Sequence, residues 1–551
     1  MASFADLAST LDKVSKTSGR NEKVRLLAEY MGGLGEEDAE RTARFATGRA
    51  SIKGSADETQ AGYSTIISVV QEATGISDRD VSSTYVKFGD LGKLVEEVIS
   101  RKKEAVLFQE EPLSLKDVDD LFTVMTQSKG KGSTSVKRGH LKAALLRATP
   151  AEAKYLVKIL TKEMRIGLVD GLVVEAIARA YGEDPEEVRS AYLLLGDVGL
   201  VARRAAAHSL SGVRLELMRP TNFMLAEPMQ TAREVADYFK KEVYAEVKYD
   251  GVRAQLHKRG EGVRIFSRRL EDVTLSFPEV VERARRYRGD LILDGEIVPF
   301  RDGRPLAFQM LQRRLRKIEG FEEAQANAPV TYFVFDILME NGAELYARPL
   351  RERRARLGEV SRETGFPLAE MSLVTRVEQV QKAFRRSRER GYEGLVLKDP
   401  DSPYTPGKRG KFWAKLKEEL DTLDVVLVGA ELGHGKRAGR LSDYTFAVRS
   451  GESFKVIGKA YSGLTDQEIE EMAVKIKAAT LHDDGYYRQL RPELVIEVAF
   501  DSIQRSDRHD SGFALRFPRI KRLRPDKSPG QVDTIERVKE IYDSQMVRSE
   551  P

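Results

Sequence analysis

The chain has 551 residues, of which 41% are hydrophobic and 32% are charged. This length predicts about three globular domains, each able to form its own hydrophobic core. The chain contains no cysteine, which excludes disulfides, thiolate metal sites and cysteine nucleophiles, and its six histidines include no HxxxH pair. The net charge of +5, from 91 basic and 86 acidic residues, allows an anionic partner but does not identify one.

The N-terminal sequence MASFADLASTLDKVSKTSGR interrupts its apolar residues with charges, unlike a signal peptide. No window approaches the eighteen apolar residues that a membrane-spanning helix requires. From these two observations we expect a soluble, cytoplasmic protein.

Residues 1–221 are expected to form an all-α domain. The clearest helix start lies in ATPAEAKYLVKIL, where Thr149 can be the N-cap, Pro150 fits the first helical position and Glu152 completes a capping box. The apolar stripe of this predicted amphipathic helix is formed by Tyr155, Leu156, Ile159, Leu160 and Met164. Just upstream, TQSKGKGSTSVKRGHL is rich in Gly, Ser and Lys and predicts a loop.

Residues 222–420 change to strand-like segments with helices between them. The predicted strands lie in VYAEVKYD, GVRIFSRR, DLILDGEIVPF, TYFVFDIL, EGLVLKD and KFWAKLK, and the helices in ERARRYRG and EQVQKAFRRSRERG. Short glycine-containing turns in KRGEGV and FRDGRP predict hairpins. This pattern indicates an α+β domain with antiparallel sheets rather than a series of βαβ units.

Residues 421–551 return to short strands separated by turns. The predicted strands lie in DTLDVVLVGAEL, YTFAVRS, SFKVIGKAY, LVIEVAF and FALRFPRIKRLR, with a single helix near TDQEIEEMAVKIKAA. This number of strands in this length suits a small β-barrel of the OB type.

The segment KYDGVRAQL raises the first question of chemistry. Strand alternation places Glu246, Lys248 and Asp250 on one face, and the pair Asp250-Gly251 then predicts a turn. Alone, a lysine between two carboxylates is explained just as well by a solvated cluster of surface charges. The residues that follow along the same domain change this balance.

Several later segments place a charged or aromatic side chain on or beside a strand whose other residues predict burial. These side chains are those of Arg268, Glu296, Phe335, Lys398, Arg409, Lys415 and Lys417. A buried charge is costly unless it has a partner. One such residue would be a core ion pair, but this many cations with carboxylates and an aromatic ring indicate a pocket for a polyanion that carries a planar base.

The order KxDGxR, SRR, DGE, FD, EGLVLK and KxK resembles the motifs of the covalent nucleotidyltransferases, which include ATP-dependent DNA ligases and capping enzymes. The segment from GKGSTSVKRGHL to EAIARAYG is similar to the DNA-binding domain of archaeal and eukaryotic ligases of the DNA ligase I type. The resemblance covers almost the whole chain in the same domain order, and the compact length is most similar to the archaeal type. It implies a helical DNA-binding domain, an adenylation domain and an OB-fold domain.

The resemblance also implies roles for individual residues. Lys248 would be the nucleophile that becomes adenylylated, Glu246 would contact the adenine amino group, and Phe335 would stack on the adenine ring. The residues implied around the ribose and phosphates are Arg253, Arg268, Arg409 and Lys415. Glu296 would contact the ribose or a hydrated metal ion, and Lys398 and Lys417 would contact phosphates.

The implied reaction requires a neutral Lys248 amine, whereas a free lysine has a pKa near 10.4. Neighbouring cations disfavour the ammonium and the carboxylates Glu246 and Asp250 favour it, so the sequence leaves the balance open. The resemblance implies ATP as AMP donor and Mg²⁺, with Mn²⁺ as an alternative ion, to neutralise the triphosphate.

The basic segment RFPRIKRLRPDK resembles the last motif of the family. Arg524 and Lys527 match its RxDK core and would cap the ATP phosphates, so we expect the C-terminal domain to rotate about a hinge near residues 418–423. A solvated basic face is the alternative interpretation.

The implied partner is nicked double-stranded DNA, bound without sequence preference. The candidate contacts in the helical domain are Lys131, Ser133, Thr134 and Lys137. The region near Phe108 lies where relatives bind a sliding clamp, although it lacks the expected glutamine. We expect a monomer.

The favoured hypothesis is therefore a ligase that seals 3′-OH/5′-phosphate nicks through a lysyl-AMP enzyme and a DNA-adenylate. A related RNA ligase or capping enzyme is the first alternative, although the helical front domain argues against it. The second alternative is a non-catalytic DNA-binding protein with a dead nucleotide pocket.

Overall fold

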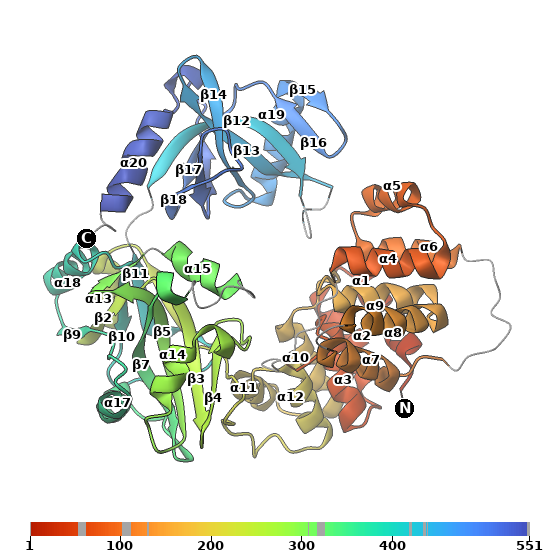
Figure 1. The fold of residues 1–551 in the computed structure, drawn as a ribbon, viewed down its shortest axis with the longest axis horizontal. Coiled ribbons are helices and arrows are strands. Elements are labelled where there is room, and N and C mark those ends of the chain that lie inside the picture. The colour runs from red at the N-terminus through yellow and green to blue at the C-terminus, as the bar shows by residue number, and fades with distance from the viewer. Residues whose placement is uncertain are drawn as a thin grey trace.

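A computed structural model describes the chain apart from residues 1, 53–61, 102–111, 129–131, 307, 317–324, 418–420, 434–436, 438 and 548–551. Figure 1 shows three parts arranged around an open centre. A helical domain (α1–α12) and a middle domain (β1–β11) lie side by side, and a C-terminal β domain (β12–α20) lies above the middle one. The predicted fold class, with a helical, an antiparallel α+β and a β domain, is confirmed.

The helical domain packs its helices around one hydrophobic core. Its elements are α1 (Phe4–Lys16), α2 (Arg20–Met31), α3 (Glu36–Ala46), α4 (Tyr63–Thr74), α5 (Asp78–Phe88), α6 (Leu91–Ser100), α7 (Leu115–Gln127), α8 (Ser133–Arg147), α9 (Pro150–Leu160), α10 (Asp170–Tyr181), α11 (Pro185–Leu195) and α12 (Val198–Ala206).

Helix α9 begins as predicted but ends earlier and is buried on all its faces. Thr149 and Glu152 form the predicted capping box, and Pro150 is the first helical residue. All residues from Glu152 to Leu160 are buried, so helix α9 lies in the centre of the domain. Met164, predicted on the helix, is buried in the following turn, where Lys162 has a φ of 58° that a helix does not allow.

The predicted loop before α9 is instead mostly helix. Gly132 adopts a φ of 91°, which a glycine tolerates, and α8 begins at Ser133. Ser133, Thr134 and Lys137 therefore lie in the first turns of this helix rather than in a loop. Its first peptide N–H groups have no partner within the helix.

The middle domain contains two sheets. Its strands are β1 (Leu225–Met229), β2 (Val243–Lys248), β3 (Val252–Arg259), β4 (Gly262–Ser267), β5 (Leu291–Arg301), β6 (Arg304–Pro305), β7 (Val330–Glu340), β8 (Ala343–Glu344), β9 (Met371–Val374), β10 (Gly394–Lys398) and β11 (Arg409–Lys417). One sheet has the order β1-β11-β10-β2-β9 and the other β4-β3-β5-β7-β8, with β6 on β5. Every pairing is antiparallel except that of β1 with β11.

Helices cover the outer faces of these sheets. They are α13 (Ala232–Phe239), α14 (Pro278–Ala284), α15 (Phe308–Arg316), α17 (Leu350–Thr364) and α18 (Val377–Glu389), with a short 3-10 turn η1 (Thr274–Ser276) before α14. Helices α13 and α18 cover the first sheet, and α14 and α17 cover the second. A separate apolar cluster that includes Tyr249, Phe335, Tyr404 and Trp413 joins the two sheets.

The C-terminal domain is a curved antiparallel sheet with helices at its margins. Its elements are β12 (Thr422–Leu432), β13 (Leu441–Ser450), β14 (Ser453–Ala460), α19 (Asp466–Ala479), β15 (Thr480–Asp483), β16 (Tyr487–Leu490), β17 (Val495–Ala499), β18 (Ser502–Arg505), β19 (Phe513–Arg516), β20 (Arg519–Leu523), a 3-10 turn η3 (Pro529–Gln531) and α20 (Ile535–Val547). Strand β12 pairs with β13 along one edge and with β17 and then β16 along the other, which curves the sheet towards a barrel.

Two details of this domain differ from the prediction. The segment FALRFPRIKRLR forms two strands, β19 and β20, because Phe517 between them has a φ of 50°. A second helix, α20, follows the strands and packs Ile535, Val538 and Ile541 into the core of the domain. The prediction of a single helix was therefore wrong.

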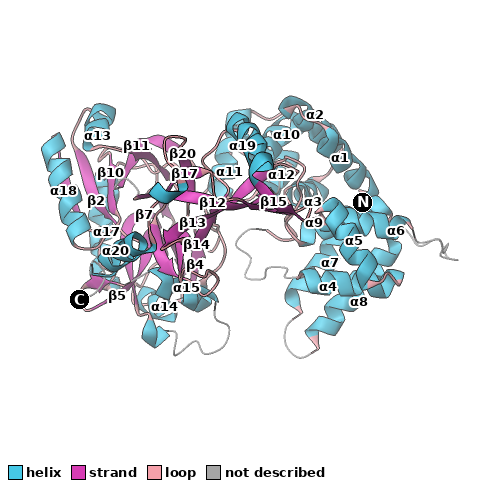
Figure 2. Ribbon diagram, turned by 90° about the horizontal axis from the view of Figure 1, so that it is seen from above, coloured by secondary structure: helices cyan, strands magenta, loops and turns pink. Residues whose placement is uncertain are grey.

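Seen from above, the helices gather in the helical domain and the sheets in the other two (Figure 2). Among the described residues, no helix is long and apolar enough to cross a membrane.

Candidate active site

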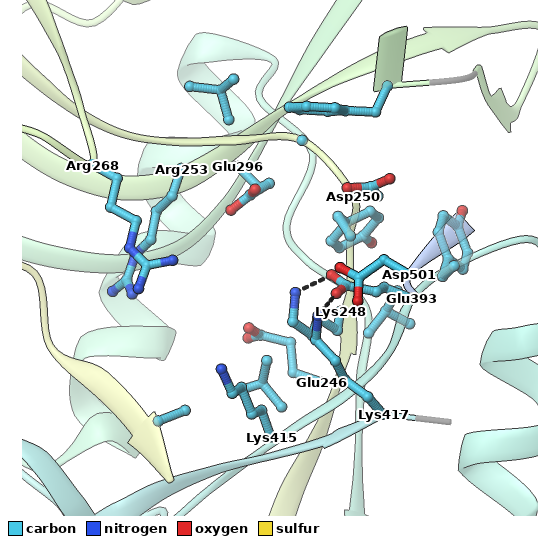
Figure 3. Close-up of a pocket in the computed structure, with 18 of the residues that line it drawn as sticks. Glu246, Lys248, Asp250, Arg253, Arg268, Glu296, Glu393, Lys415, Lys417 and Asp501 are labelled. Atoms are coloured by element: carbon cyan, nitrogen blue, oxygen red, sulfur yellow. Dashed lines mark hydrogen bonds and ion pairs between the residues drawn. The ribbon is translucent and has the colours of Figure 1, made fainter. Parts of the chain in front are cut away.

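A cavity of about 890 Å³ opens between the two sheets of the middle domain. All ten residues predicted for the nucleotide site of this domain line it: Glu246, Lys248, Arg253, Arg268, Glu296, Phe335, Lys398, Arg409, Lys415 and Lys417. The strands thus bring together side chains that are far apart in the sequence. Figure 3 shows the charged groups of this cavity facing one another.

The register of three strands explains how the lysines meet. Lys248 of β2 lies opposite Gly394 of β10, which lies opposite Lys417 of β11. One row deeper, Val396 of β10 lies between Glu246 and Lys415. Because alternate residues share a face, each row adds its charges to the same side of the sheet.

The glycine after Lys248 is required by close packing. A Cβ atom on Gly251 would lie 2.3 Å from the carbonyl oxygen of Ile297 in β5. Only glycine therefore lets the turn after Lys248 pass so close to the second sheet. The turn predicted at Asp250-Gly251 is confirmed and fixes the end of β2 at the cavity.

Glu393 is the carboxylate that connects the first row, and it is not among the predicted site residues. It forms ion pairs with Lys248 through Oε2 and with Lys417 through Oε1, as Figure 3 shows. Its peptide N–H donates to the carbonyl oxygen of Lys248 at 2.9 Å. Glu393 is the first residue of the EGLVLK motif, directly before β10, and this was the available signal because β10 pairs with β2.

Burial decides the balance of charge around Lys248 that the sequence left open. Burial lowers the pKa of the Lys248 amine. The carboxylates of Glu296 and Asp250 act to raise this pKa, and the charges of Arg268 and Arg253 act to lower it further. Burial and the Lys248 charge lower the pKa of Lys417 to about 8. The same two causes, with Arg409 and Arg268, lower the pKa of Lys415.

Glu296 lies across the cavity from the lysines. Burial raises the pKa of its carboxyl to about 7, although the charges of Lys248 and Arg253 oppose this shift. Its neighbour across the sheet, Arg253, is held by Asp294 through two hydrogen bonds of 3.1 and 2.7 Å. The Tyr404 hydroxyl donates to the same carboxylate at 2.7 Å, so Arg253 is fixed from behind.

The other end of the cavity joins a carboxylate to aromatic rings. Lys398 Nζ lies 2.6 Å from Oε1 of Glu246 and 4.2 Å from the centroid of the Phe335 ring. It also lies 4.3 Å from the centroid of the Trp413 ring. Lys398 is therefore next to the residues predicted to read the base, not among the groups predicted to bind phosphates.

Residues of the C-terminal domain form part of the wall. Asp501, Ser502, Arg516 and Phe517 line the same cavity. The Arg516 guanidinium lies 4.6 Å from the centroid of the Phe308 ring of α15 and 4.0 Å from Oδ2 of Asp250. These contacts connect the C-terminal domain to the middle domain at the cavity.

Arg524 and Lys527, the predicted phosphate cap, are not brought to the cavity. Arg524 Nη1 donates to both carboxylate oxygens of Asp424, at 2.8 and 3.0 Å. Lys527 Nζ donates to the same carboxylate at 2.5 Å. Both cations are thus paired within the C-terminal domain in this arrangement.

Of the predicted DNA contacts, Ser133, Thr134 and Lys137 lie on α8 of the helical domain, away from the cavity. Lys131 and Phe108 lie outside the described residues.

The geometry defines the class of the protein: a nucleotidyltransferase whose lysine faces a cavity lined by cations and aromatic rings. Models of known families match all three parts of the chain: the DNA ligase N terminus over residues 3–178, the ATP-dependent DNA ligase domain over 223–417 and the ATP-dependent DNA ligase C-terminal region over 437–527.

Full-length relatives and a solved structure agree with these matches. A probable DNA ligase of Koribacter versatilis is 43% identical and covers 98% of this chain and 96% of the relative. A DNA ligase of Methanothrix thermoacetophila is 38% identical over the whole of both chains. The solved structure Pmar-Lig_PreS3 covers 94% of this chain and 99% of its own with a TM-score of 0.56, and at 18% identity it supports the fold alone. The chain belongs to the ATP-dependent DNA ligases, whose general function is to seal nicks in DNA.

Proposed function

We propose that the Lys248 amine attacks the α-phosphorus of ATP and carries AMP as a phosphoramidate before AMP passes to nicked DNA. The observation that supports this most directly is the placement of Lys248 in the cation-lined cavity, where burial lowers its pKa. A neutral amine forms the N–P bond while the bond to the β-phosphate breaks, so pyrophosphate leaves and the amine loses a proton. The DNA 5′-phosphate then takes AMP from Lys248, and attack by the 3′-OH seals the nick and releases AMP.

The two ends of the cavity suggest how ATP lies in it. The base would stack on Phe335 with its amino group towards Glu246, and Lys398 would donate to an acceptor nitrogen of the base. This replaces the phosphate contact expected for Lys398. Arg253 and Glu296 would hold the ribose, and the phosphates would lie against Arg268, Arg409, Lys415 and Lys417, since these cations line the same cavity.

Mg²⁺ would bind mainly through ATP. Among the described residues no group of three or more His, Asp or Glu side chains could hold a metal ion alone. Mg²⁺ is commonly held by one or two carboxylates together with phosphate oxygens and water, and Glu296 and Glu393 offer such carboxylates in the cavity. When bound, the ion, Mg²⁺ or Mn²⁺, would neutralise phosphate charge.

We also propose how the chain is divided into domains and how these domains bind DNA and ATP. The chain would be divided into domains near residues 221 and 420, a proposal supported by the starts of β1 at Leu225 and of β12 at Thr422. The first turn of α8 would bind DNA phosphate through Ser133, Thr134 and Lys137, together with Lys131. Arg524 and Lys527 would reach the ATP phosphates only if the C-terminal domain rotates about residues 418–423.

Three further expectations remain proposals: that the enzyme works as a monomer, that it works in the cytoplasm, and that the region near Phe108 contacts a sliding clamp. The monomer is the default where the sequence offers no oligomerisation signal, the cytoplasmic location follows from the N-terminal sequence and the hydropathy, and the clamp contact follows from the sequence resemblance.

One experiment tests the function. The protein is incubated with α-labelled ATP and a divalent metal, and acid-resistant label on the chain is measured before and after nicked DNA is added. We expect label on the wild type, none on Lys248→Ala, and transfer of the label to nicked DNA with closure of the nick. Label on Lys248→Ala would refute the role of Lys248, and transfer to nicked RNA but not to DNA would indicate an RNA ligase.

A further inference from the structure

Both carboxylate oxygens of Glu246 face a cation. Oε1 lies 2.6 Å from Lys398 Nζ, and Oε2 lies 3.6 Å from Nη1 of Arg354. All three side chains are less than one tenth exposed. A buried carboxylate is costly without such partners, and its orientation is fixed by them.

The two cations differ in their access to the cavity. Lys398 lines it, whereas Arg354 is absent from its described lining and reaches Glu246 from helix α17, which packs on the other sheet. Arg354 Nη2 donates to the carbonyl oxygen of Ala369, which fixes the guanidinium, and its Nη1 has no hydrogen-bond acceptor among the described residues. Arg354 can therefore act on a nucleotide only through Glu246.

Helix α17 is a rigid support for this contact. The neighbouring Arg353 is completely buried and donates two hydrogen bonds, of 2.7 and 2.9 Å, to the equally buried Asp336. Arg353 also donates to the carbonyl oxygen of Ser402 at 2.9 Å. Side chains that hold a recognition group in place must themselves be fixed, and these contacts provide that.

We propose that Arg354 is a positioning residue that fixes the Glu246 carboxylate towards the amino group of adenine, and so sets the preference for ATP over purine nucleotides without that group. This rests on the proposed role of Glu246. A carboxylate can only accept hydrogen bonds, so it selects a base that donates one at this position. Selection by such a buried group depends on its orientation, because a misplaced acceptor leaves the amino group unpaired.

The test compares ATP with purine riboside triphosphate, which carries hydrogen in place of the amino group. We expect Arg354→Met to lower kcat/KM for adenylylation of Lys248 by about tenfold with ATP and little with the analogue. Arg354→Lys should restore much of the preference. Arg356→Met is the matched control on the same helix, because Arg356 pairs with Glu340 instead, and its preference should equal that of the wild type.

The rate at which each variant seals a pre-adenylylated nick shows whether the variant is folded. If Arg354→Met does not seal such a nick, Arg354→Gln is used in its place. An equal loss with both nucleotides, or no loss, would overturn the proposal and leave Arg354 a structural residue. The variant Glu246→Ala distinguishes a wrong role of Arg354 from a wrong role of Glu246. If Glu246→Ala keeps the preference for ATP over the analogue, the proposed role of Glu246 is wrong. If Glu246→Ala loses this preference and the Arg354 variants keep it, only the proposed role of Arg354 is wrong.

Discussion

At the scale of single residues, the chemistry of the cavity depends on how a lysine loses its proton. Glu393 contacts two lysines, Lys248 and Lys417, so one carboxylate is shared between two ammonium groups. Two cations on one anion repel each other, and burial adds to this repulsion. The protons of the pair are therefore coupled: charge on one lysine makes the other easier to deprotonate.

This coupling predicts the effect of Lys417→Met on the pH dependence of adenylylation. Without Lys417, Glu393 pairs with Lys248 alone. This favours the ammonium form of Lys248 and so raises the pKa of Lys248. The rate requires the neutral amine, so the limb that rises with pH should move to higher pH. We expect the rate to fall about tenfold at pH 7 and to recover in part at higher pH.

The measurement is single-turnover formation of enzyme-AMP between pH 5.5 and 10. Lys411→Met is the control, since Lys411 lies exposed on the same strand β11. A loss of equal size at every pH would show that Lys417 binds phosphate without acting on Lys248.

At the scale of the elements, helix α9 shows how the helical domain is fixed. Lys158 Nζ donates to Asp90 at 2.5 Å and to the carbonyl oxygen of Met164 at 3.2 Å. Asp90 is also the N-cap of α6 and accepts the peptide N–H of Lys93 at 3.0 Å. One buried pair thus joins the central helix, the start of α6 and the turn after α9.

We therefore expect Lys158→Ala to destabilise the helical domain by about 3–5 kcal/mol, because it leaves the Asp90 charge buried without a partner. The double variant Lys158→Met/Asp90→Asn should recover much of this loss, since no charge is left and the cap is kept. Urea unfolding followed by far-UV circular dichroism measures the difference. The exposed pair of Lys116 and Asp120 is the control: Lys116→Ala should leave the urea midpoint almost unchanged.

The same helix shows what the sequence can and cannot predict. The start of α9 was predictable because a capping box and a proline are local signals. Its end was not, because Met164 stays buried outside the helix, and burial alone does not distinguish the two cases. The Gly- and Ser-rich start of α8 predicts a loop, and the buried residues Leu141 and Leu145 come too late in the helix to change that prediction.

The cavity was predictable to a similar degree. The ten motif residues all line it because strand registers bring the motifs together. The contact of Arg354 with Glu246 was not predictable, since Arg354 lies on a helix that carries no motif and that packs on the other sheet. The position of Lys398 beside Phe335 and Trp413 likewise depends on which strand face turns inwards.

At the scale of the whole molecule, DNA affinity should depend on salt through individual phosphate contacts. Lys137 lies in the first turns of α8, beside the helix end where peptide N–H groups favour anions. If it binds a phosphate, Lys137→Met should reduce the slope of log K against log salt by about 0.9 for nicked duplex DNA of any sequence. Fluorescence anisotropy at several salt concentrations measures this slope. Lys116→Met, on an exposed pair of the same domain, should leave the slope unchanged, and an unchanged slope for Lys137→Met would remove α8 from the DNA interface.

The position of the C-terminal domain leads to a prediction about its rotation. Arg516 and Phe517 face the cavity, whereas Arg524 and Lys527 are paired with Asp424 away from it. If the cations of RxDK must orient the ATP phosphates, the domain has to rotate before Lys248 is adenylylated.

A linker that prevents this rotation should therefore block the first step. The chain has no cysteine, so Phe308→Cys/Arg516→Cys provides the only two thiols, at positions whose side chains touch across the two domains. Joining them with a short reducible methanethiosulfonate linker should slow formation of enzyme-AMP by about tenfold or more, because the competent arrangement is no longer populated. Reduction of the linker should restore the rate, and each single variant treated with the same reagent should keep its own rate. Adenylylation of the linked protein at the rate of the reduced one would mean that the ATP phosphates are oriented without Arg524 and Lys527, by the cations that already line the cavity.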